Sequence, residues 1–322
     1  MSTTLLDIQK LNGNDVAVGL IEENLVYAPE LQVVPFRTIK GTTYKTGIRT
    51  GLPTTGFRNA NEGQNPSKSK FREALIQCFI FGGNVEADKA VADAYEDGAE
   101  AWQIIEADGV MKSAMQNLGR QMFYGTVNDG KGFPGLKASL PKGAKTKNGD
   151  ALTIDATGTS ANKASSVYMV KFGVQDLTFV GGQNRAFDLG DFRVEMASDS
   201  EGKKFEAYVA ALTSWIGMQI GHENVARRIL NLTDQEGKGL TDILLSRLLA
   251  TYPVGYRPDA IFGSRDAITQ LQESRAAKVS LQGNAKQGTL GASDVYVPRP
   301  TDFQGIPIIE TDSIGNTDAI ES

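Results

Sequence analysis

Residues 36–74 read FRTIKGTTYKTGIRTGLPTTGFRNANEGQNPSKSKFREA, and this stretch decides how the whole chain is interpreted. It is rich in glycine, threonine, serine and asparagine, and it shows neither helical periodicity nor a catalytic pattern. VVPFRTI and TYKTGI are typical of short strands, and a polar loop at 60–70 separates them from a second extended run over 71–86. We therefore predict a long two-stranded loop, which cannot build a core of its own.

The extended run leads into the longest amphipathic helix of the chain, predicted at about 95–124. We expect Gly82 and Gly83 to end the apolar run over 75–81 before the helix begins. Gly125 is expected to stop the helix. The apolar positions at helical spacing are Ile104, Met111, Met115, Leu118 and Met122, widened by Trp102 and Ile105.

The two neighbouring segments carry opposite charge. Residues 36–74 hold eight basic and two acidic side chains, a net charge of about +6, whereas residues 86–108 hold one basic and eight acidic side chains, about −7. A basic arm without a core needs a surface to lie on, and an acidic helix on another copy of the chain is a good candidate. This combination favours an assembly protein over an enzyme.

Composition narrows the class of protein further. A length of 322 residues suggests about two domains, and 40% hydrophobic residues suffice for real cores. We expect no membrane span and no signal peptide, because neither an 18-residue apolar run nor a basic and apolar leader is present. The single cysteine fits a reducing compartment. A net charge of −5 argues against a nucleic-acid clamp.

The remaining segments alternate between strands, loops and helices. We predict a helix over 16–27, loops over 126–165, strands within 166–220, a helix over 242–252, a strand at 259–263, a helix over 265–278 capped by Ser264, a glycine-rich loop at 279–294 and a last strand at 303–310. The expected apolar face of the 242–252 helix is Ile243, Leu244, Leu248 and Leu249.

Residues that usually carry chemistry are scarce. The only histidine, His222, lacks a second histidine at metal-binding spacing, so we interpret it as structural. The only cysteine, Cys78, lies in an apolar strand and is interpreted as a buried thiol. The GKGFPG cluster at 130–135 follows a helix end, where turn chemistry is expected rather than a dinucleotide loop. We therefore predict no catalytic, cofactor-binding or metal-binding residues.

The order of these parts resembles the major capsid proteins of tailed bacteriophages, which have the α+β Hong Kong 97-type fold. The resemblance covers nearly the whole chain. It is carried by the segments VPFRTIKGTTY, FRNANEG, FGGNVEAD, RQMFYGT, PDAIFGSRDAI and QGIPIIETDSI. It implies an N-terminal arm at 1–35, an extended loop at 36–75, a peripheral domain at 76–224 around a spine helix at about 95–124, an axial domain at 225–300, and a return strand to the peripheral domain at 301–322.

The resemblance also implies a function. The expected protein assembles into pentamers and hexamers of an icosahedral shell around phage double-stranded DNA, which it contacts without sequence specificity. It is formed in the host bacterial cytoplasm and resides in the virion capsid. No fused scaffold segment is recognised, so a separate scaffolding protein, or none, and a portal are the expected partners. Lys68, Lys70 and Asn316 match by type the residues that one relative crosslinks, but solvated lysines are the interpretation adopted here.

Three alternatives remain open. A cellular nanocompartment shell of the encapsulin kind shares the fold and depends on a cargo protein. A hydrolase that uses acidic residues is a different class, disfavoured by the sparse inventory of nucleophiles and metal ligands. A receptor-binding β-protein is weakened by the long helix and the lack of a signal peptide.

Overall fold

The computed structural model describes residues 26, 28–126, 131–185, 189–198, 201–283 and 297–321. Its helices and strands are, in chain order, α2 (Glu30–Val33), β1 (Phe36–Thr38), β2 (Thr43–Gly51), β3 (Lys70–Gln77), β4 (Phe79–Asp88), α3 (Lys89–Ala92), α4 (Ala99–Tyr124), α5 (Leu136–Ser139), β5 (Thr153–Asp155), β6 (Ser165–Val170), β7 (Leu177–Gly181), β8 (Arg193–Ser198), β9 (Lys204–Ile220), β10 (Ala226–Leu232), α6 (Asp242–Ala250), β11 (Ala260–Gly263), α7 (Arg265–Gly283), β12 (Asp302–Phe303) and β13 (Ile306–Glu310).

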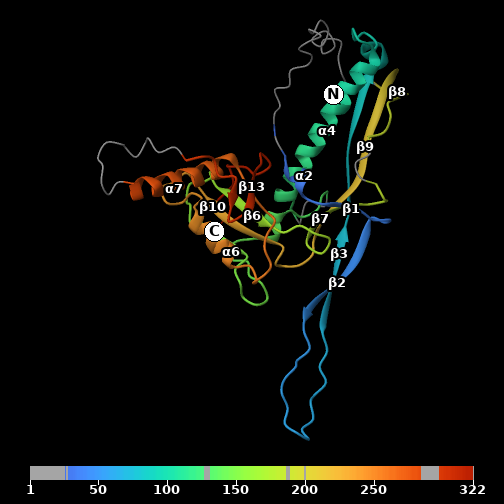
Figure 1. Ribbon diagram of the computed structural model, residues 1–322. Helices are drawn as coiled ribbons and strands as arrows, with labels where there is room; N and C mark the ends of the chain where they lie inside the picture. Colours follow the sequence, from blue (N-terminus) through green and yellow to red (C-terminus); the bar gives the residue numbers. More distant parts are fainter. Residues whose placement is uncertain are drawn as a thin grey trace.

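These elements form two sheets and a separate hairpin (Figure 1). The five-stranded sheet has the order β1-β7-β9-β4, with β8 paired to the start of β9, and α4 runs alongside it. The six-stranded sheet has the order β12-β13-β11-β6-β10-β5 and packs against α6 and α7. The hairpin of β2 and β3 projects away from both sheets. The predicted α+β class and the predicted two-stranded loop are thus confirmed.

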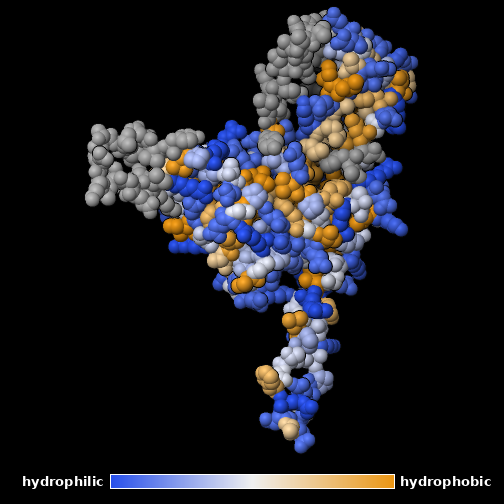
Figure 2. All heavy atoms as spheres, viewed as in Figure 1, coloured by the Kyte–Doolittle hydropathy of each residue, from blue (hydrophilic) through white to orange (hydrophobic). Residues whose placement is uncertain are grey.

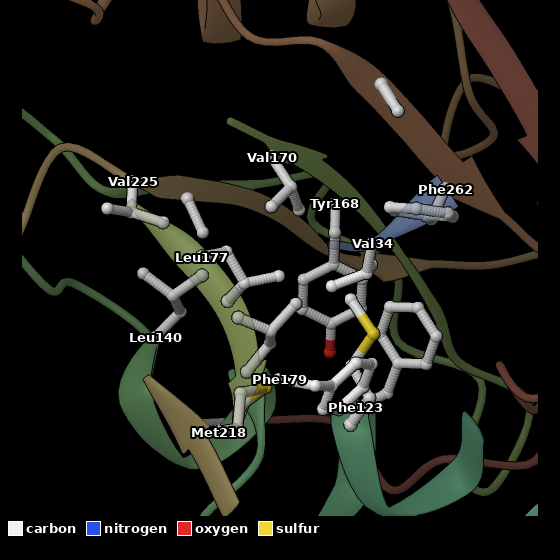
Figure 3. Packing of buried hydrophobic residues seen from close by; sticks show 14 of the residues in the cluster. Val34, Phe123, Leu140, Tyr168, Val170, Leu177, Phe179, Met218, Val225 and Phe262 are labelled. Atoms are coloured by element: carbon white, nitrogen blue, oxygen red, sulfur yellow. The ribbon is translucent and has the colours of Figure 1, made fainter. Parts of the chain in front are cut away.

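The main core lies where the two sheets meet the end of α4 (Figure 3). Phe123 of α4 packs its ring 5.2 Å from the ring of Tyr168 and 5.7 Å from that of Phe262, both on the six-stranded sheet. Phe179 and Met218 close the same cluster from the five-stranded sheet. One core therefore joins the two sheets.

The long helix begins slightly later than predicted, at Ala99 rather than about residue 95, and ends at Tyr124 as expected. Trp102 is fully buried against β4, with Ile105 half-buried beside it, so the predicted packing of both residues is confirmed. The prediction for Ile104 is wrong, since its side chain is 70% exposed. Two residues turn a helix by about 200°, which places Ile104 opposite Trp102.

Gly82 and Gly83 end the apolar run as predicted, but they do not end the strand. β4 continues through both glycines to Asp88, and Gly82 and Gly83 pair with Thr213 and Leu212 of β9. A β-carbon on Gly82 would lie 2.4 Å from the carbonyl oxygen of Leu212. Glycine is needed here because the backbone of β9 comes very close, not because the chain turns.

The remaining predictions concern the helices α6 and α7, the last strand and two segments that lie mostly outside the described residues. Ser264 caps α7, since the Ala267 amide donates to its Oγ at 3.3 Å, and α7 runs beyond residue 278. In α6 Leu248 is buried and Leu244 and Leu249 pack against the core as expected, whereas Ile243 is 54% exposed and Leu245 is buried in its place. The strand predicted over 303–310 is confirmed from Ile306 onward as β13, whereas its first residues form the end of β12 and a turn. The helix predicted over 16–27 lies almost wholly outside the described residues, as does most of the 279–294 loop.

Glu30 of α2 attaches the start of the described chain to α4. Its carboxylate is fully buried and accepts a hydrogen bond of 2.7 Å from the hydroxyl of Thr311. Its Oε1 has no hydrogen-bond partner among the described residues. A β-carbon on Gly119 would come within 2.1 Å of this oxygen, so the close packing requires glycine at this position of α4. Burial raises the pKa of Glu30 above its ordinary 4.5.

This raised pKa predicts a pH-dependent stability. The folded state holds the Glu30 proton more tightly than the unfolded chain, so its stabilising effect is full below pH 4.5 and is lost as pH rises through the folded pKa. At neutral pH the folded protein must therefore either bury the charge or take up a proton that the unfolded chain does not hold, and both lower its stability. We expect Glu30→Gln to raise the melting temperature of unassembled subunits at pH 7 and to lose this advantage near pH 4. The exposed Glu236→Gln is the control, and an equal effect of both variants at pH 7 would contradict the expectation.

Candidate assembly surface

The hairpin of β2 and β3 is the most distinctive surface of the described chain (Figure 2). Its strands pair from Thr43 with Gln77 out to Gly51 with Lys70, and beyond that point residues 52–69 form an irregular distal loop. Almost every side chain of this distal loop is exposed. The hairpin therefore presents polar backbone and basic side chains to whatever lies beside it.

Apolar side chains on the hairpin are also uncovered. Phe71 and Leu75 of β3 are 66% and 63% exposed, and the register places them opposite Arg49 and Lys45 of β2 on the same face. The Arg49 guanidinium lies 5.6 Å from the centre of the Phe71 ring. One face of the hairpin thus carries both apolar and basic side chains, which is a composition typical of protein–protein interfaces.

A basic recess lies at the base of the hairpin. It has a volume of about 740 Å³ and separates β2 from the turn at 221–224. Its basic lining residues are Arg37, Lys45, Arg49, Arg72 and Lys147. Arg37 is fixed by a 3.0 Å hydrogen bond to Gln219 and by the Tyr44 ring, 4.4 Å from its guanidinium carbon. A recess of this kind is suited to acidic side chains of a partner.

His222 lines the same recess, where it takes part in a bonded cluster. Its Nε2 lies 3.1 Å from Asp176 Oδ1 and 3.0 Å from the hydroxyl of Tyr256, which also donates to Asp176. Its Nδ1 accepts the amide of Asn224 at 3.1 Å. The cluster ties the turn between β9 and β10 to the turn before β7 and the loop after α6. These hydrogen bonds are consistent with the structural role predicted for His222, and its partners Asp176 and Tyr256 had no signal in the sequence.

Cys78 is buried, as predicted, between the hairpin base and the five-stranded sheet. Its thiol lies 3.6 Å from the carbonyl oxygen of Val180, and burial raises its pKa. The described part of the 130–135 cluster packs against the end of α4, where the Gly135 amide donates to the Gly125 carbonyl at 2.8 Å. This packing is consistent with the irregular, turn-like segment predicted there. Within the described residues no group of three or more histidine, cysteine, aspartate or glutamate side chains is placed to hold a metal.

The acidic segment lies far from the hairpin tip. It covers the end of β4, α3 and the first turns of α4, at the opposite end of the molecule (Figure 1). Glu96 and Glu100 are exposed there, whereas Asp93 is within 3.9 Å of Lys89. The two oppositely charged segments of one chain therefore do not meet each other.

Comparisons with known proteins identify the family. The family profile described as Major capsid protein GP7 matches residues 31–320. The chain belongs to this major capsid protein family. Its function is therefore structural, and its place is the capsid of a virion. No curated protein matched the chain.

The fold of this capsid protein also has solved counterparts. The structure titled for bacteriophage Epsilon15 is similar over 100% of this chain and 98% of its own, with 19% identity and a TM-score of 0.72. The bacteriophage JBD30 capsid protein matches 85% of this chain and 90% of its own, with 13% identity and a TM-score of 0.50. The expected Hong Kong 97-type capsid fold is thus confirmed. None of the described helices is long and apolar enough to span a membrane.

Proposed function

We propose that this capsid protein assembles into pentamers and hexamers of an icosahedral shell that encloses phage double-stranded DNA. The observation that carries the proposal is the projecting hairpin, whose basic and apolar side chains have no cover from their own chain. Electron microscopy of the expressed chain in negative stain tests it. Closed shells or capsomer rings are expected, and monomers at every concentration and salt would contradict it.

The two sheets support a division into domains. We propose that the five-stranded sheet with α4 is the peripheral domain and that the six-stranded sheet with α6 and α7 is the axial domain. The six-stranded sheet takes β5 and β6 from before residue 224 and β10 to β13 from after it. The proposed boundary therefore follows the sheets rather than a single cut in the sequence. Beyond β13, Ser313 and Gly315 return to α4, where Gly315 donates to the Tyr124 hydroxyl at 2.9 Å.

The lack of catalysis, the mode of DNA contact and the protein partners are also proposed. We propose a shell role without catalysis, supported by the bonded state of His222 and the burial of Cys78. Contact with packaged DNA is proposed to be independent of sequence, consistent with the net charge of −5. A portal and a separate scaffolding protein are the proposed protein partners besides other copies of this chain.

We propose that the hairpin, within the predicted loop 36–75, lies over the acidic segment 86–108 of a neighbouring subunit. The net charges of about +6 and −7 and the distance between the two segments within one chain support this contact. Each exposed ion pair contributes only about 0–1 kcal/mol. Because a shell repeats the contact at every subunit, these small contributions act together on assembly.

Charge reversal tests this contact. The double variant Lys68→Glu, Lys70→Glu is expected to weaken assembly at low salt, because the hairpin then repels the acidic segment. Adding Glu96→Lys and Glu100→Lys is expected to restore part of the assembly. Light scattering at low and high salt measures the effect, since exposed pairs are screened over about 8–10 Å at physiological ionic strength.

The matched control reverses Lys145 and Lys163, two exposed lysines outside the hairpin, with the same change in net charge. Assembly of this control is expected to follow the unchanged chain. If the hairpin double variant also assembles like the unchanged chain at every salt concentration, the two segments do not touch.

A further inference from the structure

The distal loop of the hairpin presents one aromatic ring without any cover. Phe57 is fully exposed, with a relative accessible area of 110%. The residues around it are tied down: Arg58 donates to the Glu62 carbonyl at 2.7 Å, and the Gln64 side chain donates to the Gly56 carbonyl at 2.6 Å. The Asn59 amide adds a 3.1 Å bond to the Glu62 carboxylate. These hydrogen bonds join residues on both sides of Phe57 and restrict the loop, which lowers the entropy lost on binding.

A complementary groove lies at the other end of the molecule. It has a volume of about 430 Å³ and lies between the first turns of α4 and the segment 189–192. Its apolar walls are Ile104, which is 70% exposed, and Phe192. The Phe192 ring meets the buried Trp102 ring edge-on at 6.1 Å, so this wall is anchored in the core. Glu100 and Asp191 add carboxylates to the lining.

The apolar surface continues from the groove along β8. Val194 and Met196 are 50% and 58% exposed. Val194 pairs with Tyr208, which packs in the Trp102 cluster, so both β8 side chains lie on the face of the sheet that carries α4. Uncovered apolar side chains that adjoin a groove with acidic side chains are typical of a docking surface.

We infer that Phe57 of one subunit inserts into this groove of a neighbouring subunit, between Ile104 and Phe192. The inference rests on the proposed function and adds an apolar anchor to the charge contact. The distal loop that carries Phe57 and the first turns of α4 that line the groove lie at opposite ends of one chain, so only a second copy can join them (Figure 1). Arg58 beside the ring is positive, and the groove carries the carboxylates of Glu100 and Asp191. This opposite charge orients the hairpin on the groove.

Cysteine pairing tests the contact directly. In the full chain carrying Phe57→Cys and Ile104→Cys, a disulfide requires Cα atoms about 4.4–6.8 Å apart. After assembly and oxidation with copper phenanthroline, a denaturing gel without reductant is expected to show a ladder of covalently linked subunits that reductant abolishes. Cys78 does not interfere because it is only 1% exposed.

The controls are Phe57→Cys alone and Phe57→Cys with Val254→Cys, since Val254 is fully exposed on the loop after α6. Both are expected to remain single chains. The inference is overturned if shells visible by microscopy give no ladder, or if the Val254 pair gives the same ladder. Failure of the unchanged chain to form any shell would instead contradict the proposed function.

Substitution without cysteine keeps the inference testable if the paired variant does not assemble. Phe57→Ala is expected to raise the protein concentration needed for assembly about tenfold, whereas Phe57→Leu retains most of it. Ile104→Ala is expected to act similarly, and the two changes together less than additively, because they remove one contact. Val254→Ala is the matched control. Assembly of Phe57→Ala at the unchanged threshold would overturn the inference.

Discussion

Replacing Trp102 with alanine is expected to lower the free energy of unfolding of the subunit by about 3–5 kcal/mol. The indole is completely buried between α4 and the five-stranded sheet, among Val85, Ala92 and Tyr95. Alanine would leave a cavity at the point where the first half of the long helix is attached. Because neighbouring side chains on a sheet and a helix cannot collapse fully into such a space, most of the lost packing is not recovered.

Two further variants separate packing from hydrogen bonding. The Trp102 Nε1 has no hydrogen-bond partner among the described residues, so Trp102→Phe is expected to retain much of the stability. The exposed Ile104→Ala in the same helix is expected to leave the unfolding of the free subunit unchanged. Denaturant unfolding of unassembled subunits measures all three. An unchanged midpoint for Trp102→Ala would show that the ring is on the surface.

Replacing Arg228 with alanine is also expected to lower the free energy of unfolding by about 3–5 kcal/mol, because it removes one partner of a buried ion pair and leaves the other without its counter-charge. The guanidinium extends from β10, the strand next to the edge strand β5, and donates to Ser166 Oγ at 2.8 Å and to the Leu140 carbonyl at 3.2 Å. It also pairs with Glu321 at 2.7 Å and lies over the Tyr168 ring. Arg228→Ala would leave these acceptors unpaired in a dry environment.

A double-mutant cycle isolates the ion pair. Arg228→Met keeps most of the volume but loses the charge, and Glu321→Gln removes the partner charge near the end of the described chain. The combined variant is expected to lose less stability than the sum of the single variants, because both changes remove one interaction. Thermal unfolding of free subunits measures the coupling. Strict additivity, or an unfolding curve for Arg228→Ala like that of the unchanged chain, would contradict the role of the pair.

The sequence was informative wherever local pattern dominates. Hydrophobic spacing located α4, and alternation with polar turns located the hairpin, because both elements are set by residues close in the chain. It did not reveal β10, whose seven residues are all buried although they include Arg227 and Arg228. Two adjacent arginines usually indicate a surface. Here Arg227 is accommodated by the Tyr252 ring and by hydrogen bonds to Asn224 and to the Glu223 carbonyl, and Arg228 by the polar groups around it.

What the sequence determined by itself is the list of parts: a basic arm, an acidic helix start, a class of fold and the scarcity of catalytic side chains. The tertiary structure alone decided which distant parts meet. Gly82 continues a strand because of the backbone of β9, and Glu30 is buried because Gly119 leaves room for it. It also placed the distal loop of the hairpin and the first turns of α4 at opposite ends of the molecule. Such pairings join residues far apart in the chain, so no local pattern encodes them.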